Sequence, residues 1–127
     1  MSATLELPLS APATPQWSTE LWISFASLLR SHVAMHSIAR PHAKLRIRGG
    51  ADSDSRLEVL GPGGKLVLLA PDASGTGVME FRPPTGELGD QYNTFFFTVD
   101  GLFHLAAQNV ALDMEAAVED LLRKVQA

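Results

Sequence analysis

Apolar side chains recur with a helical period over residues 14 to about 37. Thr14 is suited to cap this helix and Pro15 to begin it, and Arg40-Pro41 ends it because the residue before a proline avoids the α region. On a helical wheel the apolar positions fill an arc much wider than a surface helix needs. Such an arc predicts contact with two partners, for instance a sheet and either a second helix or another subunit.

The period changes to two between Lys44 and Ala106, which predicts five or six strands. The residues at 61–64, "GPGG", predict a hairpin with a four-residue loop. Asp100-Gly101 lies between two apolar runs and predicts a type I′ hairpin, with strands near 94–99 and 102–106. Because the links between successive strands are short, the sequence favours an antiparallel meander over parallel pairing.

The last segment is again helical, with Asp113 as its expected N-cap. Its apolar positions follow one helical stripe, and its charges suit the helix dipole, acidic at the start and basic at the end. The predicted fold is therefore α+β: an N-terminal helix, an antiparallel meander of five to six strands and a C-terminal helix, with both helices packed on one sheet face. Residues 1–13 are predicted to be a flexible or extended arm, and residues 14–127 a single α+β domain.

Composition narrows the class of protein. A chain of 127 residues is long enough for one domain with its own core. It contains no cysteine, which excludes disulfides and thiolate metal sites, and its net charge of −4 argues on electrostatic grounds against a nucleic-acid partner. No stretch has the length and apolar character of a membrane span, and the N-terminus lacks the basic residues of a secretory signal. We expect a cytoplasmic protein without a cofactor or a membrane partner.

His32 and His36 lie one helical turn apart, within the apolar arc of the first helix. Two imidazoles in this arrangement can share a zinc ion, as they do in HExxH sites. Here the motif is HVAMH, without the glutamate, so a third ligand would have to be His42, His104 or a carboxylate. The sequence favours two histidines at the edge of the core that are bonded to a carbonyl or to water. Metal binding and a pH-sensitive contact are the alternatives.

The basic residues concentrate near residues 40–48, where the candidates for anion binding are Arg40, Lys44, Arg46 and Arg48. The favoured interpretation is a solvated strand face, on which Glu58 of the next strand could pair with Arg46 or Arg48. The alternative is a site for phosphate, nucleic acid or an acidic partner. No aromatic residue alternates with these cations, which argues against a single-stranded nucleic acid.

Three consecutive phenylalanines, residues 95–97, must point to alternating sides of a strand. If the outer two face the helices, Phe96 lies on the other face of the sheet and marks an apolar surface for a partner. We take Trp22, Phe96, Val78 and Leu68 as interface candidates and expect His104 to be a solvated strand residue.

These observations favour a non-enzymatic protein-interaction module that associates with itself as a homodimer or with another protein. No catalytic residue is assigned. The first alternative is a small-molecule-binding protein or small enzyme with a cavity between sheet and helix, lined by Trp17, Trp22, Tyr92 and His104. A weaker alternative is an anion or nucleic-acid contact through Lys44, Arg46 and Arg48.

Overall fold

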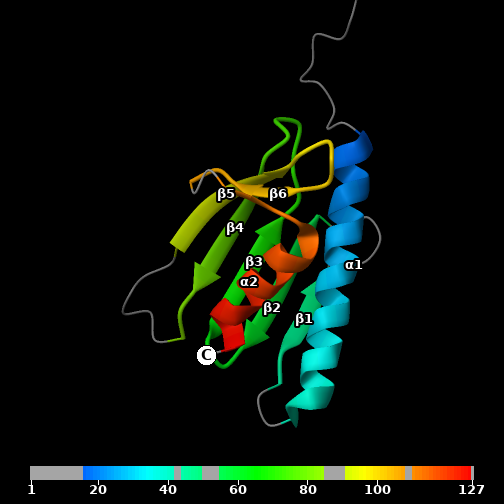
Figure 1. Ribbon diagram of the computed structural model, residues 1–127. Coiled ribbons are helices and arrows are strands. Elements are labelled where there is room, and N and C mark those ends of the chain that lie inside the picture. The colour runs from blue at the N-terminus through cyan, green and yellow to red at the C-terminus, as the bar shows by residue number, and fades with distance from the viewer. Residues whose placement is uncertain (1–15, 42–43, 50–54, 85–90, 108–109, 127) are drawn as a thin grey trace, which may run out of the picture.

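The computed structural model describes residues 16–41, 44–49, 55–84, 91–107 and 110–126. The predicted arm at 1–13, Thr14 and Pro15 lie outside these residues. Along the chain, one helix precedes the strands and one follows them (Figure 1). The order is α1 (Gln16–Ala39), β1 (Arg46–Gly49), β2 (Arg56–Gly61), β3 (Gly64–Leu69), β4 (Gly77–Arg82), β5 (Gln91–Phe97), β6 (Phe103–Leu105), β7 (Val110–Leu112) and α2 (Met114–Gln126).

The strands form one antiparallel sheet in the order β1-β2-β3-β4-β5-β6-β7, which confirms the predicted meander. The predicted number of strands is too low, because the described residues form seven strands and the sequence indicated five or six. The missed strand is β7, which has three residues and ends one residue before Asp113. Three residues are too few for period-two alternation to stand out from the helical pattern that follows.

Both helices lie on the same face of the sheet, as predicted (Figure 1). Alternate residues of the strands point toward them and form the core with one face of each helix. The ring of Phe25 on α1 stacks on Phe103 at 5.1 Å between centroids and meets Phe97 at 5.7 Å. Phe95 and Phe97 are both buried, so the middle phenylalanine faces the other way.

The β2–β3 hairpin is tighter than predicted, with a two-residue loop, Pro62-Gly63, in place of four residues. Gly61 and Gly64 pair with each other across the ladder. The backbone N–H of Gly63 donates to the carbonyl oxygen of Val125 at 2.9 Å, which satisfies a carbonyl in the last turn of α2. The strands thus extend into "GPGG", and the end of the hairpin contacts the end of α2.

The β5–β6 hairpin has a three-residue loop, Val99–Gly101, so the predicted type I′ turn is wrong. The N–H of Gly101 donates to the carbonyl of Thr98 at 2.9 Å, and Gly101 has φ 90, the conformation that favours glycine. The Thr98 hydroxyl accepts the N–H of Leu102 at 3.0 Å. This side-chain bond takes the place of a ladder bond and ends the strands earlier than the apolar pattern suggests.

Candidate functional site

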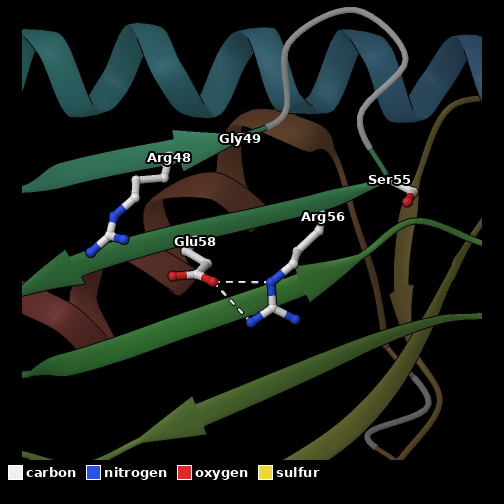
Figure 2. A pocket seen from close by; sticks show the side chains of 5 residues that line it. All are labelled: Arg48, Gly49, Ser55, Arg56 and Glu58. Atoms are coloured by element: carbon white, nitrogen blue, oxygen red, sulfur yellow. Dashed lines mark hydrogen bonds and ion pairs between the residues drawn. The ribbon is translucent and has the colours of Figure 1, made fainter.

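The helices leave one face of the sheet uncovered, and we call it the open face (Figure 2). Its residues alternate along each strand with the residues that enter the core. From the strand register its described side chains are Arg46, Arg48, Arg56, Glu58, Leu60, Lys65, Val67, Leu69, Val78, Glu80, Arg82, Tyr92, Thr94, Phe96, His104 and Ala111.

The cations of the open face gather on β1–β4, and we call this part the basic patch: Arg46, Arg48, Arg56, Glu58, Lys65, Glu80 and Arg82. Its five cations and two carboxylates give a net charge of +3. The whole chain carries −4, so all remaining residues together sum to −7. Positive charge is therefore segregated onto the face that no helix covers.

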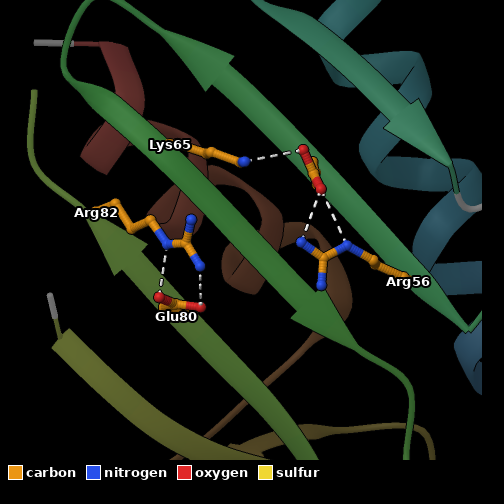
Figure 3. A network of polar contacts seen from close by, with 5 residues as sticks. Arg56, Lys65, Glu80 and Arg82 are labelled. Atoms are coloured by element: carbon orange, nitrogen blue, oxygen red, sulfur yellow. Dashed lines mark hydrogen bonds and ion pairs between the residues drawn. The ribbon is translucent and has the colours of Figure 1, made fainter.

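Glu58 and Glu80 are the two anions within this patch, and both are ion-paired (Figure 3). Glu58 accepts from Arg56, with 2.8 Å between Nη2 and Oε2, and from Lys65, with 3.2 Å between Nζ and Oε1. The hydrogen bond from Arg56, reinforced by Lys65, holds the pKa of Glu58 below its ordinary value against the opposing effect of burial. Glu80 accepts from Arg82 Nε at 2.6 Å.

Arg46 and Arg48 lie at the edge of the patch on β1, and both are exposed. The register places Arg48 opposite Glu58, yet the ion pairs of Glu58 are with Arg56 and Lys65. Within the described part of the chain, no carboxylate forms an ion pair with Arg46 or Arg48. The charge of these two guanidinium groups is therefore not neutralised by the described side chains.

A shallow cleft of about 360 Å³ opens at one end of the basic patch (Figure 2). Its lining residues are Arg48, Gly49, Ser55, Arg56 and Glu58. The side chains of Arg48 and Arg56 reach over the sheet surface, and the Glu58 carboxylate faces Arg56. The other two predicted anion-binding residues, Arg40 and Lys44, are exposed but lie outside β1, the former directly after α1.

The four predicted interface residues divide between the two faces of the sheet. Phe96 and Val78 lie on the open face and are partly buried. The Phe96 ring stacks on His104 at 4.6 Å on the open face. His104 is not the solvated residue that was predicted, because it is partly buried and its Nδ1 atom is shielded from solvent. The interface prediction is wrong for Trp22 and Leu68, because these side chains are buried in the core, with 4 % and 0 % of their surface exposed. Leu68 shares its strand face with Leu66 and so points toward the helices.

Tyr92 is a residue of the open face that the interface prediction missed, and its side chain is 68 % exposed. The sequence could have indicated this, because Tyr92 is four residues from Phe96 on the same strand and so points to the same face. The four aromatic residues predicted to line a cavity are not brought together. Trp22 stacks on Phe95 within the core, Tyr92 and His104 are on the open face, and Trp17 is 37 % exposed on α1.

The two histidines of α1 both reach the boundary with α2. His32 Nε2 lies 2.8 Å from Glu115 Oε2. His32, His36 and Glu119 line a groove of about 490 Å³ between the helices, together with Met35 and Leu122. His42 lies outside the described residues. Among the described residues, no three His, Asp or Glu side chains are already arranged to hold a metal ion.

Comparison with known proteins gives no relative: no family model matches the chain, and neither a curated protein nor a solved structure is similar to it. Among the described residues, neither helix has the length and apolar character needed to cross a membrane. The surface chemistry described above is therefore the basis for inferring what the protein does.

Proposed function

We propose that the protein is a non-enzymatic interaction module that binds an acidic segment of another protein on its open face. The observation that carries this proposal is the segregation of charge, with +3 on the basic patch and −7 on all other residues. An anionic partner gains most where guanidinium groups are not already neutralised, and Arg46 and Arg48 meet this condition among the described residues. Arginine binds carboxylates with two parallel hydrogen bonds, which favours a protein carboxylate as ligand.

An acidic protein segment fits this surface better than a nucleic acid does. A nucleic acid is a long polyanion whose binding depends on a broad positive field. The total charge of −4 opposes such a field beyond the basic patch. A short acidic segment instead needs few charges and can add apolar contacts to Leu69 or Val78, next to the patch.

Self-association is the second candidate, and a separate observation favours it. Val78, Thr94 and Phe96 form an uncharged area of the open face over β4–β5, and Glu80 lies at its edge, directly opposite Tyr92. A two-fold axis could bring this uncharged area against its own copy without repulsion between basic patches. The exposure of Tyr92 supplies the aromatic contact that such interfaces favour.

Fluorescence anisotropy with a labelled peptide of six glutamates flanked by leucines tests the proposal. Wild-type protein should bind it at low salt, and the double variant Arg46→Gln/Arg48→Gln should weaken binding by at least about tenfold, equal to roughly 1.4 kcal/mol. The matched control is Arg30→Gln/Arg123→Gln, which removes the same charge from the two helices. Equal losses in both double variants, or no binding by the wild type, would overturn the proposal.

Light scattering on the same samples measures self-association separately. A dimer that Tyr92→Glu converts to a monomer would identify the uncharged part of the open face as the interface. A monomer at every concentration would rule out self-association. The proposal of an acidic protein partner would then be decided by the peptide-binding result.

A further inference from the structure

β1 is the first strand of the sheet in space, so one of its two sides forms an edge. Within the described part of the chain, β1 pairs with β2 and with no other strand. An edge of this kind can accept an extended segment as an additional strand, held by main-chain hydrogen bonds. Arg46 and Arg48, which no described carboxylate neutralises, are both on this strand.

The hydrogen bonds of β2 show which backbone groups of β1 point outward. The N–H of Ala70 donates to the carbonyl oxygen of Ser55 at 2.7 Å, so Ser55 and every second residue after it direct their backbone groups toward β3. Glu58 is three residues further along and therefore directs its groups toward β1, where it is opposite Arg48. Because Arg48 bonds to β2, its neighbour Ile47 directs both N–H and C=O to the free edge.

A contact just before β1 agrees with this orientation. The carbonyl of Leu45 points to the same side as that of Ile47, and it accepts the hydroxyl of Ser37 on α1 at 3.0 Å. In Figure 2, α1 runs along β1 on the side away from β2. A strand added at this edge therefore lies over α1. Ala34, one turn before Ser37, is exposed and small enough to leave room there for an apolar side chain.

We propose that the acidic partner segment binds as an extra antiparallel strand on the outer edge of β1, with the pattern acidic–apolar–acidic. This inference rests on the proposed function and specifies the conformation of the partner. The apolar residue is opposite Ile47 and exchanges two main-chain hydrogen bonds with it. The acidic residues on either side of it are opposite Arg46 and Arg48, and strand alternation directs these charged side chains to the open face.

Two N-methylated versions of one labelled peptide, of alternating glutamate and leucine, test this mode of binding with the full chain. The versions carry equal numbers of N-methyl groups, placed on leucines in one and on glutamates in the other. Methylation of leucine removes the donors that face Ile47. In fluorescence anisotropy it should weaken binding by at least about tenfold, whereas methylation of glutamate, whose N–H faces away, should change affinity by less than about threefold.

Amide hydrogen exchange provides a measurement on the protein itself. The unmethylated peptide should slow exchange of the Ile47 N–H by at least about tenfold. The matched control is Ala111 on β7, at the opposite edge of the sheet. The N–H of Ala106 donates to the carbonyl of Thr94, so the same alternation directs the backbone groups of Ala111 outward. Exchange at Ala111 should not change when the peptide binds.

The outcomes separate this inference from the proposed function. Equal affinity of the two methylated peptides, each still weakened by Arg46→Gln/Arg48→Gln, would overturn strand addition and leave the proposed function standing. The reverse order of affinities would overturn the antiparallel register. Exchange at Ile47 that slows with protein concentration alone, together with a dimer in light scattering, would assign the edge to a second copy and also overturn the inference. Failure of every acidic peptide to bind would overturn both proposals.

Discussion

Glu58 organises the charges of the basic patch, because it accepts hydrogen bonds from both Arg56 and Lys65. Its pKa is lowered in the folded protein from an ordinary value of 4.5, chiefly by the bond from Arg56. The ionised form is therefore stabilised by folding. This contribution is fully present above the unfolded pKa and is lost as the pH falls through the lower pKa of the folded state.

We expect Glu58→Gln to lower the free energy of unfolding by about 1 kcal/mol at neutral pH, the upper range for an ion pair near the surface. The difference from wild type should shrink as the pH falls below about 4.5, because the carboxylate of the unfolded wild-type chain then takes up a proton before that of the folded protein does. Urea unfolding at several pH values measures it. The control Glu119→Gln replaces an exposed carboxylate of α2 and should change stability by less than about 0.5 kcal/mol. A Glu58→Gln effect that is constant with pH would contradict the assigned ion pairs.

Gly61 is required by packing, because a β-carbon there would collide with the carbonyl oxygen of Val125. We expect Gly61→Ala to destabilise the protein by about 1–3 kcal/mol, the usual cost of overpacking. The control is Gly75→Ala, where φ is +83 and no atom of the described residues lies within 4 Å of the added carbon. That control pays only the backbone cost, roughly 1 kcal/mol. Urea denaturation compares the two, and a larger cost at Gly75 would mean that the hairpin moves away from α2 without penalty.

The helices and long strands could be predicted because each carries several turns or repeats of its pattern. α2 begins where Asp113 predicted it, and the strands of the β2–β3 and β5–β6 hairpins overlap the predicted segments, although their ends differ. The loops could not be predicted. Their lengths depend on contacts with distant atoms, such as Gly63 with Val125, and on side-chain competition, such as the Thr98 hydroxyl with the ladder.

Asp113 offers a test of how much one cap contributes to α2. Its Oδ1 accepts the N–H of Ala116 at 2.8 Å, one of the donors that the helix itself cannot satisfy. We expect Asp113→Ala to cost about 1 kcal/mol, whereas Asp113→Asn should retain most of the stability because Asn also caps helices well. Thermal or urea unfolding of both variants provides the comparison. If the two variants lose the same stability, the charge of Asp113 at the helix dipole matters and the cap bond does not.

At the scale of the whole molecule, alternation predicted that Phe96 and Phe95 lie on opposite faces, and the buried Phe95 agrees. It could not show how segments meet that are distant along the chain. His32 contacts Glu115, which lies 83 residues away, and this contact is what makes the histidine pair part of a groove between helices. Similarly, the strand register alone does not determine which neighbouring cation forms an ion pair with Glu58. Arg56 and Lys65 reach it, although Arg48 is directly opposite.

Both helices and the sheet share one core, so we expect the described parts of the chain to unfold together. Trp22 reports on this core because it stacks on Phe95, and a Trp17→Phe background isolates its fluorescence from the exposed tryptophan. In that background, urea unfolding followed by Trp22 fluorescence and by far-ultraviolet circular dichroism should give the same midpoint.

Phe25→Ala removes a ring that contacts both β5 and β6, and should lower the free energy of unfolding by about 3–5 kcal/mol. Both signals should shift by the same amount. Loss of fluorescence at lower urea than the loss of helical signal would show that α1 separates from the sheet first, so the groove with α2 would open without global unfolding.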